Sequence, residues 1–276
     1  MKKLFAASLV ILCFSVLPVF AQTANIVKSD LSQTEINKIV AKFTKNEALF
    51  RKALNIYAYN RTAMIQSIGM GGQISGVFRM DSFHSFDASG ERIEKILFAP
   101  MPTLKDMTVS REDIDNLSGV NPFAIEPSSV ANYNFTYLGK EHIDELDLYV
   151  FEVSPKTLPD PRKSNQKYFS GRIWVDTEDL LIVRSKGKAL PEGKNMQGLE
   201  QKFPVMETWR DRIDGKYWFP VLSSSDDELI FDDGHAVKLK VRVKYTNYRV
   251  GRVDVKIGDD EVEVKEETKP TPTKKP

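Results

Sequence analysis

Three histidines are the residues of this sequence best suited to acid–base or metal chemistry. His84, His142 and His235 lie far apart along the chain, and none belongs to a pair at the spacing of a metal site. His84 and His235 stand beside predicted turns, where a solvated histidine is expected. The histidines therefore predict neither a metal centre nor a catalytic base.

Other patterns that carry chemistry are incomplete. The sequence has no Gly-x-Ser-x-Gly nucleophile elbow, and Gly69-Met70-Gly71-Gly72 lacks the Gly-Lys-Ser/Thr of a phosphate loop, so we expect a hairpin turn there. The acidic runs Asp226-Asp227-Glu228 and Asp232-Asp233 lack the ligand spacing of a calcium loop, and we interpret them as turn residues. We therefore expect no catalytic residue, metal or cofactor, and predict that the chain is not an enzyme. A secreted hydrolase with two carboxylates that meet in space is the least favoured alternative.

Aromatic residues are concentrated in segments that alternate apolar and polar residues. Curved sheets commonly enclose a pocket, and bulky side chains on the strands are candidates to line it. For any single residue the alternative is an ordinary place in the core. The candidates for a hydrophobic cavity are Phe78, Phe98, Phe135, Tyr137, Tyr149, Phe151, Trp174, Trp209 and Trp218.

Two helices are expected to position this site. Ser32-Gln33-Thr34-Glu35 is a capping box, and apolar residues follow at helical spacing through residues 36–54, which predicts a long amphipathic helix. Ser110-Arg111-Glu112-Asp113 resembles a second helix start, with Ile114 and Leu117 on its apolar side. The second helix would be a short insert in the middle of the chain.

The rest of the chain is typical of strands joined by short turns, which favours antiparallel pairing. The expected hairpins pair residues 73–86 with 92–98, 133–137 with 149–153, 168–175 with 180–185, 205–213 with 217–222, and 229–231 with 236–248. A sheet of roughly ten to eleven strands twists and tends to curl. The predicted fold is α+β: a single large curved antiparallel sheet, an unclosed β-barrel, covered by the long N-terminal helix and the short insert.

The two ends of the chain are not expected to belong to the folded domain. Lys2 and Lys3, the apolar run Leu4–Val16 and the motif Val19-Phe20-Ala21 match a cleavable signal peptide over residues 1–21. Cys13 lies within this segment, so the mature chain would have no cysteine. Residues 254–276 are charged and proline-rich, which predicts a disordered tail. We therefore expect a bacterial protein exported to the periplasm, with one domain over residues 22–253.

The charge of the mature chain is nearly balanced. Removing Lys2 and Lys3 from the 39 Lys and Arg leaves 37, against 38 Asp and Glu. Nucleic-acid binding needs a concentrated excess of cations, so nucleic acid is not an expected partner.

Three strand motifs in the middle of the chain carry a family resemblance. They are Tyr149-Val150-Phe151-Glu152-Val153-Ser154-Pro155-Lys156, Gly171-Arg172-Ile173-Trp174-Val175-Asp176 and Leu181-Ile182-Val183-Arg184. Together with the order of elements from Leu31 to Tyr248, they resemble the bacterial outer-membrane lipoprotein-sorting family, the LolA/LolB-like proteins, whose superfamily includes the RseB-type periplasmic sensors. The chain is longer than the compact carriers of this family and has an additional tail.

The resemblance implies a fold and a function. It implies helices that act as a lid over a cavity for acyl chains, and a periplasmic carrier that moves lipids or lipoproteins toward the outer membrane. Inner- and outer-membrane transport or signalling proteins would be its partners. In some carriers a strand arginine bonds to the lid, and Arg79 in Gly76-Val77-Phe78-Arg79 is the candidate by position. The alternative on the same fold is an RseB-like envelope-stress sensor that binds a protein partner.

Overall fold

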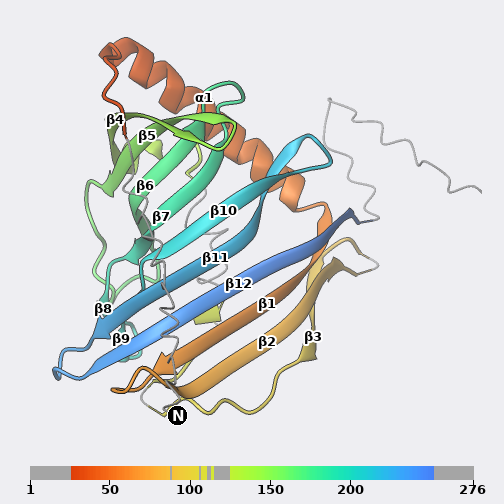
Figure 1. Ribbon diagram of the computed structural model, residues 1–276, viewed down its shortest axis with the longest axis vertical. Coiled ribbons are helices and arrows are strands. Elements are labelled where there is room, and N and C mark those ends of the chain that lie inside the picture. Colours follow the sequence, from red (N-terminus) through yellow and green to blue (C-terminus); the bar gives the residue numbers. More distant parts are fainter. Residues whose placement is uncertain (1–25, 88, 106, 111–112, 115–124, 252–276) are drawn as a thin grey trace, which may run out of the picture.

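The structure is a computed structural model that describes residues 26–87, 89–105, 107–110, 113–114 and 125–251. It contains one long helix, α1 (Gln33–Leu54), a short 3-10 helix, η1 (Val130–Asn132), and two antiparallel sheets (Figure 1). The strands are β1 (Tyr57–Ile68), β2 (Ile74–Phe86), β3 (Arg92–Phe98), β4 (Tyr133–Ile143), β5 (Leu146–Pro155), β6 (Tyr168–Asp176), β7 (Ile182–Leu190), β8 (Gly193–Lys194), β9 (Glu200–Gln201), β10 (Met206–Ile213), β11 (Tyr217–Ile230) and β12 (Ala236–Val250).

Ten strands form one sheet in the order β3-β2-β1-β12-β11-β10-β7-β6-β5-β4, and β8 and β9 form a small separate hairpin. Most neighbours are consecutive in the chain, which confirms the predicted hairpins. The pairing of β1 with β12 instead joins the two ends of the domain. In the part of the chain that the structure describes, β3 and β4 end the sheet without pairing with each other, so the barrel is unclosed, as predicted.

The turn between β10 and β11 shows how local sequence sets this meander. Asp214 and Gly215 have φ values of 51° and 66°. Lys216 N donates to the Ile213 carbonyl across this turn, and Ile213 pairs with Tyr217, so three residues separate the strands. Positive φ at both central turn positions matches the right-handed twist of the strands, and Asp-Gly is a preferred pair there. The local sequence therefore fixes the register of this hairpin.

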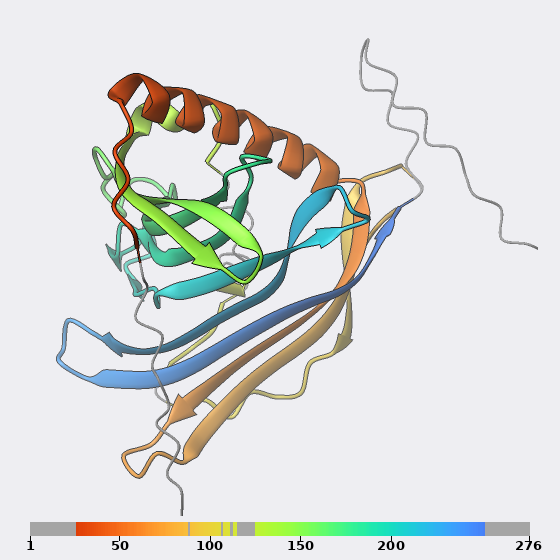
Figure 2. The ribbon, with the colours of Figure 1, turned by 45° about the horizontal axis from the view of Figure 1, so that its top comes forward.

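Helix α1 begins at the predicted capping box. Ser32 Oγ accepts a hydrogen bond from the Glu35 backbone N–H, and the Glu35 carboxylate accepts one from Ser32 N at 2.8 Å. The helix packs along one face of the sheet, which we call the inner face; the opposite face is the outer face. Figure 2 shows α1 lying over the half of the sheet that contains β4 to β7, while β11, β12, β1 and β2 extend away below it.

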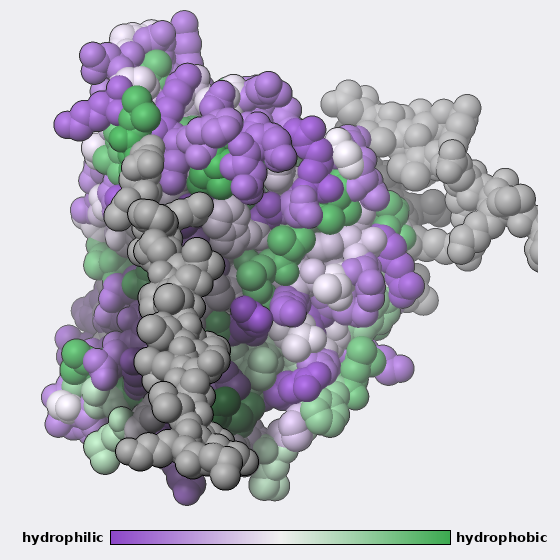
Figure 3. Space-filling view, in the orientation of Figure 1, coloured by the Kyte–Doolittle hydropathy of each residue, from purple (hydrophilic) through white to green (hydrophobic). Residues whose placement is uncertain are grey.

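The buried face of α1 contributes to two hydrophobic clusters. Ile39, Val40 and Phe43 pack with inward residues of β4 to β7. Phe50 and Leu54 pack with inward residues of β1, β2, β11 and β12. A third cluster lies on the outer face, around Trp174 and Trp218. The surface seen in the direction of Figure 1 is mostly hydrophilic, with hydrophobic residues scattered over it (Figure 3).

The predicted second helix is described only at its start. Asp113 N donates to Ser110 Oγ at 3.1 Å, Ser110 N donates to Asp113 Oδ2 at 2.8 Å, and Ile114 N donates to Ser110 O. Leu117, the predicted signal peptide (1–21) and the predicted tail (254–276) lie outside the described residues. Among the residues described, no helix is long and apolar enough to span a membrane.

Candidate functional site

A cavity of about 610 Å³ lies on the inner face of the sheet. It is bounded by β1, β11 and β12 below and by residues 107–110, 113 and 195–204 at its sides. It is lined by Ile65, Met107, Thr108, Val109, Ser110, Asp113, Ala189, Asn195, Gln197, Leu199, Glu200, Gln201, Lys202, Phe203, Pro204, Met206, Leu229, Phe231, His235, Leu239 and Val241. Its volume lies within the ordinary range for small-molecule sites.

The floor of the cavity is aliphatic because of strand alternation. On β12, Leu239 and Val241 point inward, while Lys238, Lys240 and Arg242, which alternate with them, point outward. Ile65 lies opposite Val241 on β1, in direct register. Met206 and Leu229, from β10 and β11, complete a floor whose residues are all buried and belong to one hydrophobic cluster.

The rim of the cavity is polar and charged. Lys202 Nζ lies 3.1 Å from a carboxylate oxygen of Glu200 and 3.1 Å from one of Asp232. The hydrogen bond to Asp232, followed by that to Glu200, holds the pKa of Lys202 above its usual value. Leu199, which is 67% exposed, stands beside these charges. Hydrocarbon would therefore fit against the floor, while a polar end group would meet water and charge at the rim.

Four of the nine predicted cavity aromatics lie in the core under α1 instead. Phe135, Tyr137, Tyr149 and Phe151 belong to the cluster beneath the helix, where the Phe43 ring lies 5.8 Å from Phe135 and 6.0 Å from Phe151. Phe78 is the exception, since it lies in the same cluster as the cavity floor, although it does not line the cavity.

The remaining aromatic candidates lie on the outer face or at the edge of the sheet. Trp174 and Trp218 are buried in the outer cluster, and Trp174 donates a hydrogen bond to Glu141 at 2.6 Å. The Arg184 guanidinium lies between the rings of Trp174 and Trp209, at 4.2 and 4.5 Å.

Phe98 is half exposed on β3. None of these nine aromatic residues lines the inner-face cavity, because alternation along a strand does not reveal which face of the sheet holds the open space.

Two strand arginines bond to α1: Arg210 on β10 bonds to Glu47, and Arg92 on β3 donates to the carbonyl of Leu54 at 2.6 Å, whereas the predicted candidate Arg79 lies on the other face. Arg79 points to the outer face, is about half exposed and pairs with Asp81 at 2.7 Å. Arg210, on β10, is almost fully buried and donates to both carboxylate oxygens of Glu47 in α1, at 2.7 and 2.9 Å. A glutamate on the apolar side of the predicted helix was the sequence signal for this pair.

A second buried polar cluster was also missed. His84 was expected in solvent, but it is buried and stacks on the Tyr59 ring at 4.6 Å. Its Nε2 lies 3.3 Å from Glu94, whose carboxylate also accepts a hydrogen bond from buried Arg61 at 2.7 Å. By contrast, His235 is half exposed beside its turn, as predicted.

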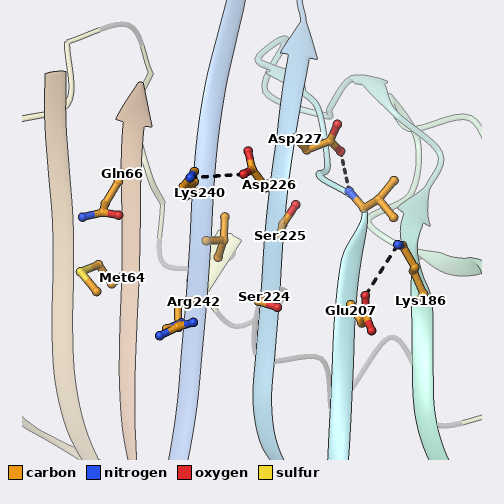
Figure 4. A pocket seen from close by; sticks show the side chains of 12 residues that line it. Met64, Gln66, Lys186, Glu207, Ser224, Ser225, Asp226, Asp227, Lys240 and Arg242 are labelled. Atoms are coloured by element: carbon orange, nitrogen blue, oxygen red, sulfur yellow. Dashed lines mark hydrogen bonds and ion pairs between the residues drawn. The ribbon is translucent and has the colours of Figure 1, made fainter. Parts of the chain in front are cut away.

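The outer face carries a hollow of about 630 Å³ across β1, β12, β11, β10 and β7 (Figure 4). Lys240 pairs with Asp226 at 3.3 Å, Lys186 pairs with Glu207 at 3.6 Å, and Asp227 accepts a hydrogen bond from Val205 N. Asp226 to Glu228 therefore lie within strand β11, and the interpretation of this run as a turn is wrong. Nowhere in the described ranges do three or more His, Cys, Asp or Glu residues gather as a metal site.

The sequence matches no family model and no curated protein sequence. Among solved structures, the chain is similar to a DUF1329 family protein from Desulfovibrio piger, with 16% identity over 79% of this chain and 95% of that chain, at a TM-score of 0.37. It is also similar to MucB in its complex with MucA(peri), with 11% identity over 76% of this chain and 100% of that chain, at a TM-score of 0.24. Both likenesses are distant.

Proposed function

We propose that this protein is a periplasmic carrier that binds the acyl chain of a lipid or lipoprotein in the inner-face cavity, for transport toward the outer membrane. The observation that carries the proposal is the cavity itself: an open space of about 610 Å³ with a continuous aliphatic floor and a charged rim. The resemblance of the sequence to lipoprotein-sorting proteins and the pattern of its first residues support the periplasmic location.

The free energy expected of such a site is sufficient for a carrier. Each methylene removed from water contributes roughly 0.8 kcal/mol. About ten methylenes against the floor would give on the order of 8 kcal/mol, which corresponds to a micromolar complex. A carrier needs this range, because much tighter binding would prevent release.

The same geometry supports binding rather than catalysis. At the rim, Lys202 pairs with Glu200 and Asp232, His235 contacts Asp233, and Asp113 accepts hydrogen bonds from Ser110. The floor holds no titratable group. An acyl chain lying on the floor would meet aliphatic side chains along its length. We therefore propose a binding protein that uses no catalytic residue and no cofactor.

The test is uptake of a fluorescent fatty-acid analogue by delipidated mature protein. Ala189 is buried and lines the cavity, so Ala189→Phe places a ring into the open space. We expect it to weaken uptake at least tenfold. The control is Ala41→Phe, on the exposed side of α1, which adds the same ring outside the cavity and should leave uptake unchanged. Thermal unfolding of both variants checks that the fold is retained.

Native mass spectrometry of protein purified gently from an envelope would add the identity of the cargo. A lipid-sized adduct that is lost on organic extraction is the expected result. If the unsubstituted protein takes up no acyl ligand, or if Ala189→Phe takes it up as well as Ala41→Phe does, the carrier proposal is wrong. The sensor-like interaction module on the same fold would then be the better explanation.

A further inference from the structure

Four neighbouring strands present a basic surface on the outer face. Seven cationic side chains point outward from β3, β2 and β12, five of them from β12, with the uncharged outward side of β1 between β2 and β12, and all seven are exposed. These residues, which we call the basic face, are Arg79, Lys95, Lys238, Lys240, Arg242, Lys244 and Arg249. The only carboxylate on this side of the four strands is Asp81, because Glu94 points inward to Arg61. The chain is therefore nearly neutral as a whole, but cations are in excess on this part of its surface.

Most of these cations are not neutralised by neighbours. Arg79 pairs with Asp81, and Lys240 pairs with Asp226 of β11. Within the described ranges, the cations Lys95, Arg242 and Lys244 form no ion pair. On β12, Arg242 stands in register with Met64 on one side and Ser224 on the other, as Figure 4 shows.

Arg249 also forms no ion pair within the described ranges, and its guanidinium lies 5.0 Å from the ring of Phe83. The uncompensated charge is therefore concentrated toward the C-terminal half of β12 and the adjoining strands.

Apolar side chains stand beside this charge at the edge of the sheet. β3 is an edge strand, and Ile93 and Phe98 are 44% and 50% exposed on its outward side. Both flank Lys95 along the same strand. Exposed apolar groups next to cations are the combination that binds the interface of an anionic bilayer, where the cations meet phosphate and the apolar groups enter the acyl boundary.

We propose that the basic face docks this protein onto an anionic phospholipid surface, with Arg242, Lys244 and Arg249 on the headgroups and Phe98 at the boundary. The charge complementarity and the adjoining apolar edge select a membrane over a soluble acidic polypeptide, which would need no exposed phenylalanine. Docking through the outer face leaves the inner-face cavity unobstructed. The proposal does not depend on the cavity holding a lipid.

The test is co-sedimentation of the mature chain with vesicles of equal parts phosphatidylglycerol and phosphatidylcholine, compared with pure phosphatidylcholine. We expect binding only to the anionic vesicles, weakened by added salt. The triple variant Arg242→Gln, Lys244→Gln, Arg249→Gln should bind about a hundredfold more weakly, since each cation near such a surface contributes roughly fivefold. The matched control removes three exposed cations of α1, as Lys38→Gln, Lys42→Gln and Lys45→Gln, and should bind like the unsubstituted chain.

The proposal is overturned by equal binding to both kinds of vesicle, by an unaffected triple variant, or by an equal loss in the α1 control. Failure to bind anionic vesicles at all would also overturn it, and would leave an acidic polypeptide as the occupant of this face. Uptake of the fluorescent fatty acid, measured without vesicles on the same variants, reports on the cavity separately. Either activity can therefore fail while the other is retained.

Discussion

Glu47 offers the sharpest test of how this fold is held together. Its carboxylate is fully buried in the middle of α1, between the two hydrophobic clusters to which the helix contributes. Its charge is balanced by Arg210 alone among the residues described, through two hydrogen bonds of 2.7 and 2.9 Å. Arg210 has one further acceptor, the carbonyl of Ile182 at 3.2 Å, and its guanidinium lies 4.2 Å from the Phe50 ring.

We predict that Glu47→Leu lowers the free energy of unfolding by about 3–5 kcal/mol, because it leaves the guanidinium buried without a counter-charge. Whole domains are stable by about 5–15 kcal/mol, so this loss is a large fraction of the total. The double variant Glu47→Leu, Arg210→Met replaces both charges with apolar groups of similar size. It should recover most of the loss, since no unpaired charge remains and the surrounding clusters are apolar.

Urea unfolding followed by tryptophan fluorescence measures these differences, with Trp209 adjacent to Arg210 in the chain. The control is Glu152→Leu, which removes a half-exposed partner lying 3.5 Å from Arg172. That change should cost less than about 1 kcal/mol. The reasoning is refuted if Glu47→Leu is no more destabilising than the control, or if the double variant is as unstable as the single one.

Three further predictions concern single positions. Ser32→Ala removes the N-cap of α1 and should lower the free energy of unfolding by about 1 kcal/mol, measured in urea. Gly171→Ala should cost more, since a Cβ there would lie 2.2 Å from the carbonyl oxygen of Lys186 at a φ of 152°; a soluble variant of unchanged melting temperature would contradict this. Burial, followed by the hydrogen bond to Asp214, raises the pKa of the Tyr57 phenol well above its usual value. The stability from Tyr57 is thus fully present below about pH 10 and lost above it, so Tyr57→Phe should flatten the fall of melting temperature at alkaline pH.

The predictable part of the fold is the part that is local in sequence. Three local patterns each predict a structure from a few neighbouring residues, and each structure is found where it was expected. They are the capping box at Ser32, the turn at Asp214-Gly215 and the strand pattern of 149–153. Hairpin neighbours follow from such signals because a short turn leaves antiparallel pairing as the only compact arrangement. The unclosed ten-stranded sheet follows from joining these hairpins in order.

The remaining features depend on contacts between distant segments. Tyr57 pairs with Val250, and nothing in either strand marks the other as its partner. Arg79 and Arg210 lie on opposite faces of the sheet, and only the inner face is covered by α1. Alternation along a strand separates residues into two faces but does not show which face the helix covers. His84 was misplaced for the same reason, because its neighbour Glu94 becomes a partner only when β3 folds back on β2.

Aromatic and aliphatic residues occupy different parts of the inner face. Rings fill space and pair with one another, so Phe43, Phe135 and Phe151 pack tightly where α1 covers the sheet. The floor of the cavity is instead built of Ile65, Leu239 and other aliphatic side chains. These side chains have no rings to stack across the cavity and fill it. One inner face thus serves two purposes: its aromatic parts pack against the helix, and its aliphatic part beside residues 195–204 stays open. Phe151→Leu should therefore lower the free energy of unfolding without changing acyl uptake. Ala189→Phe should weaken acyl uptake without lowering the free energy of unfolding.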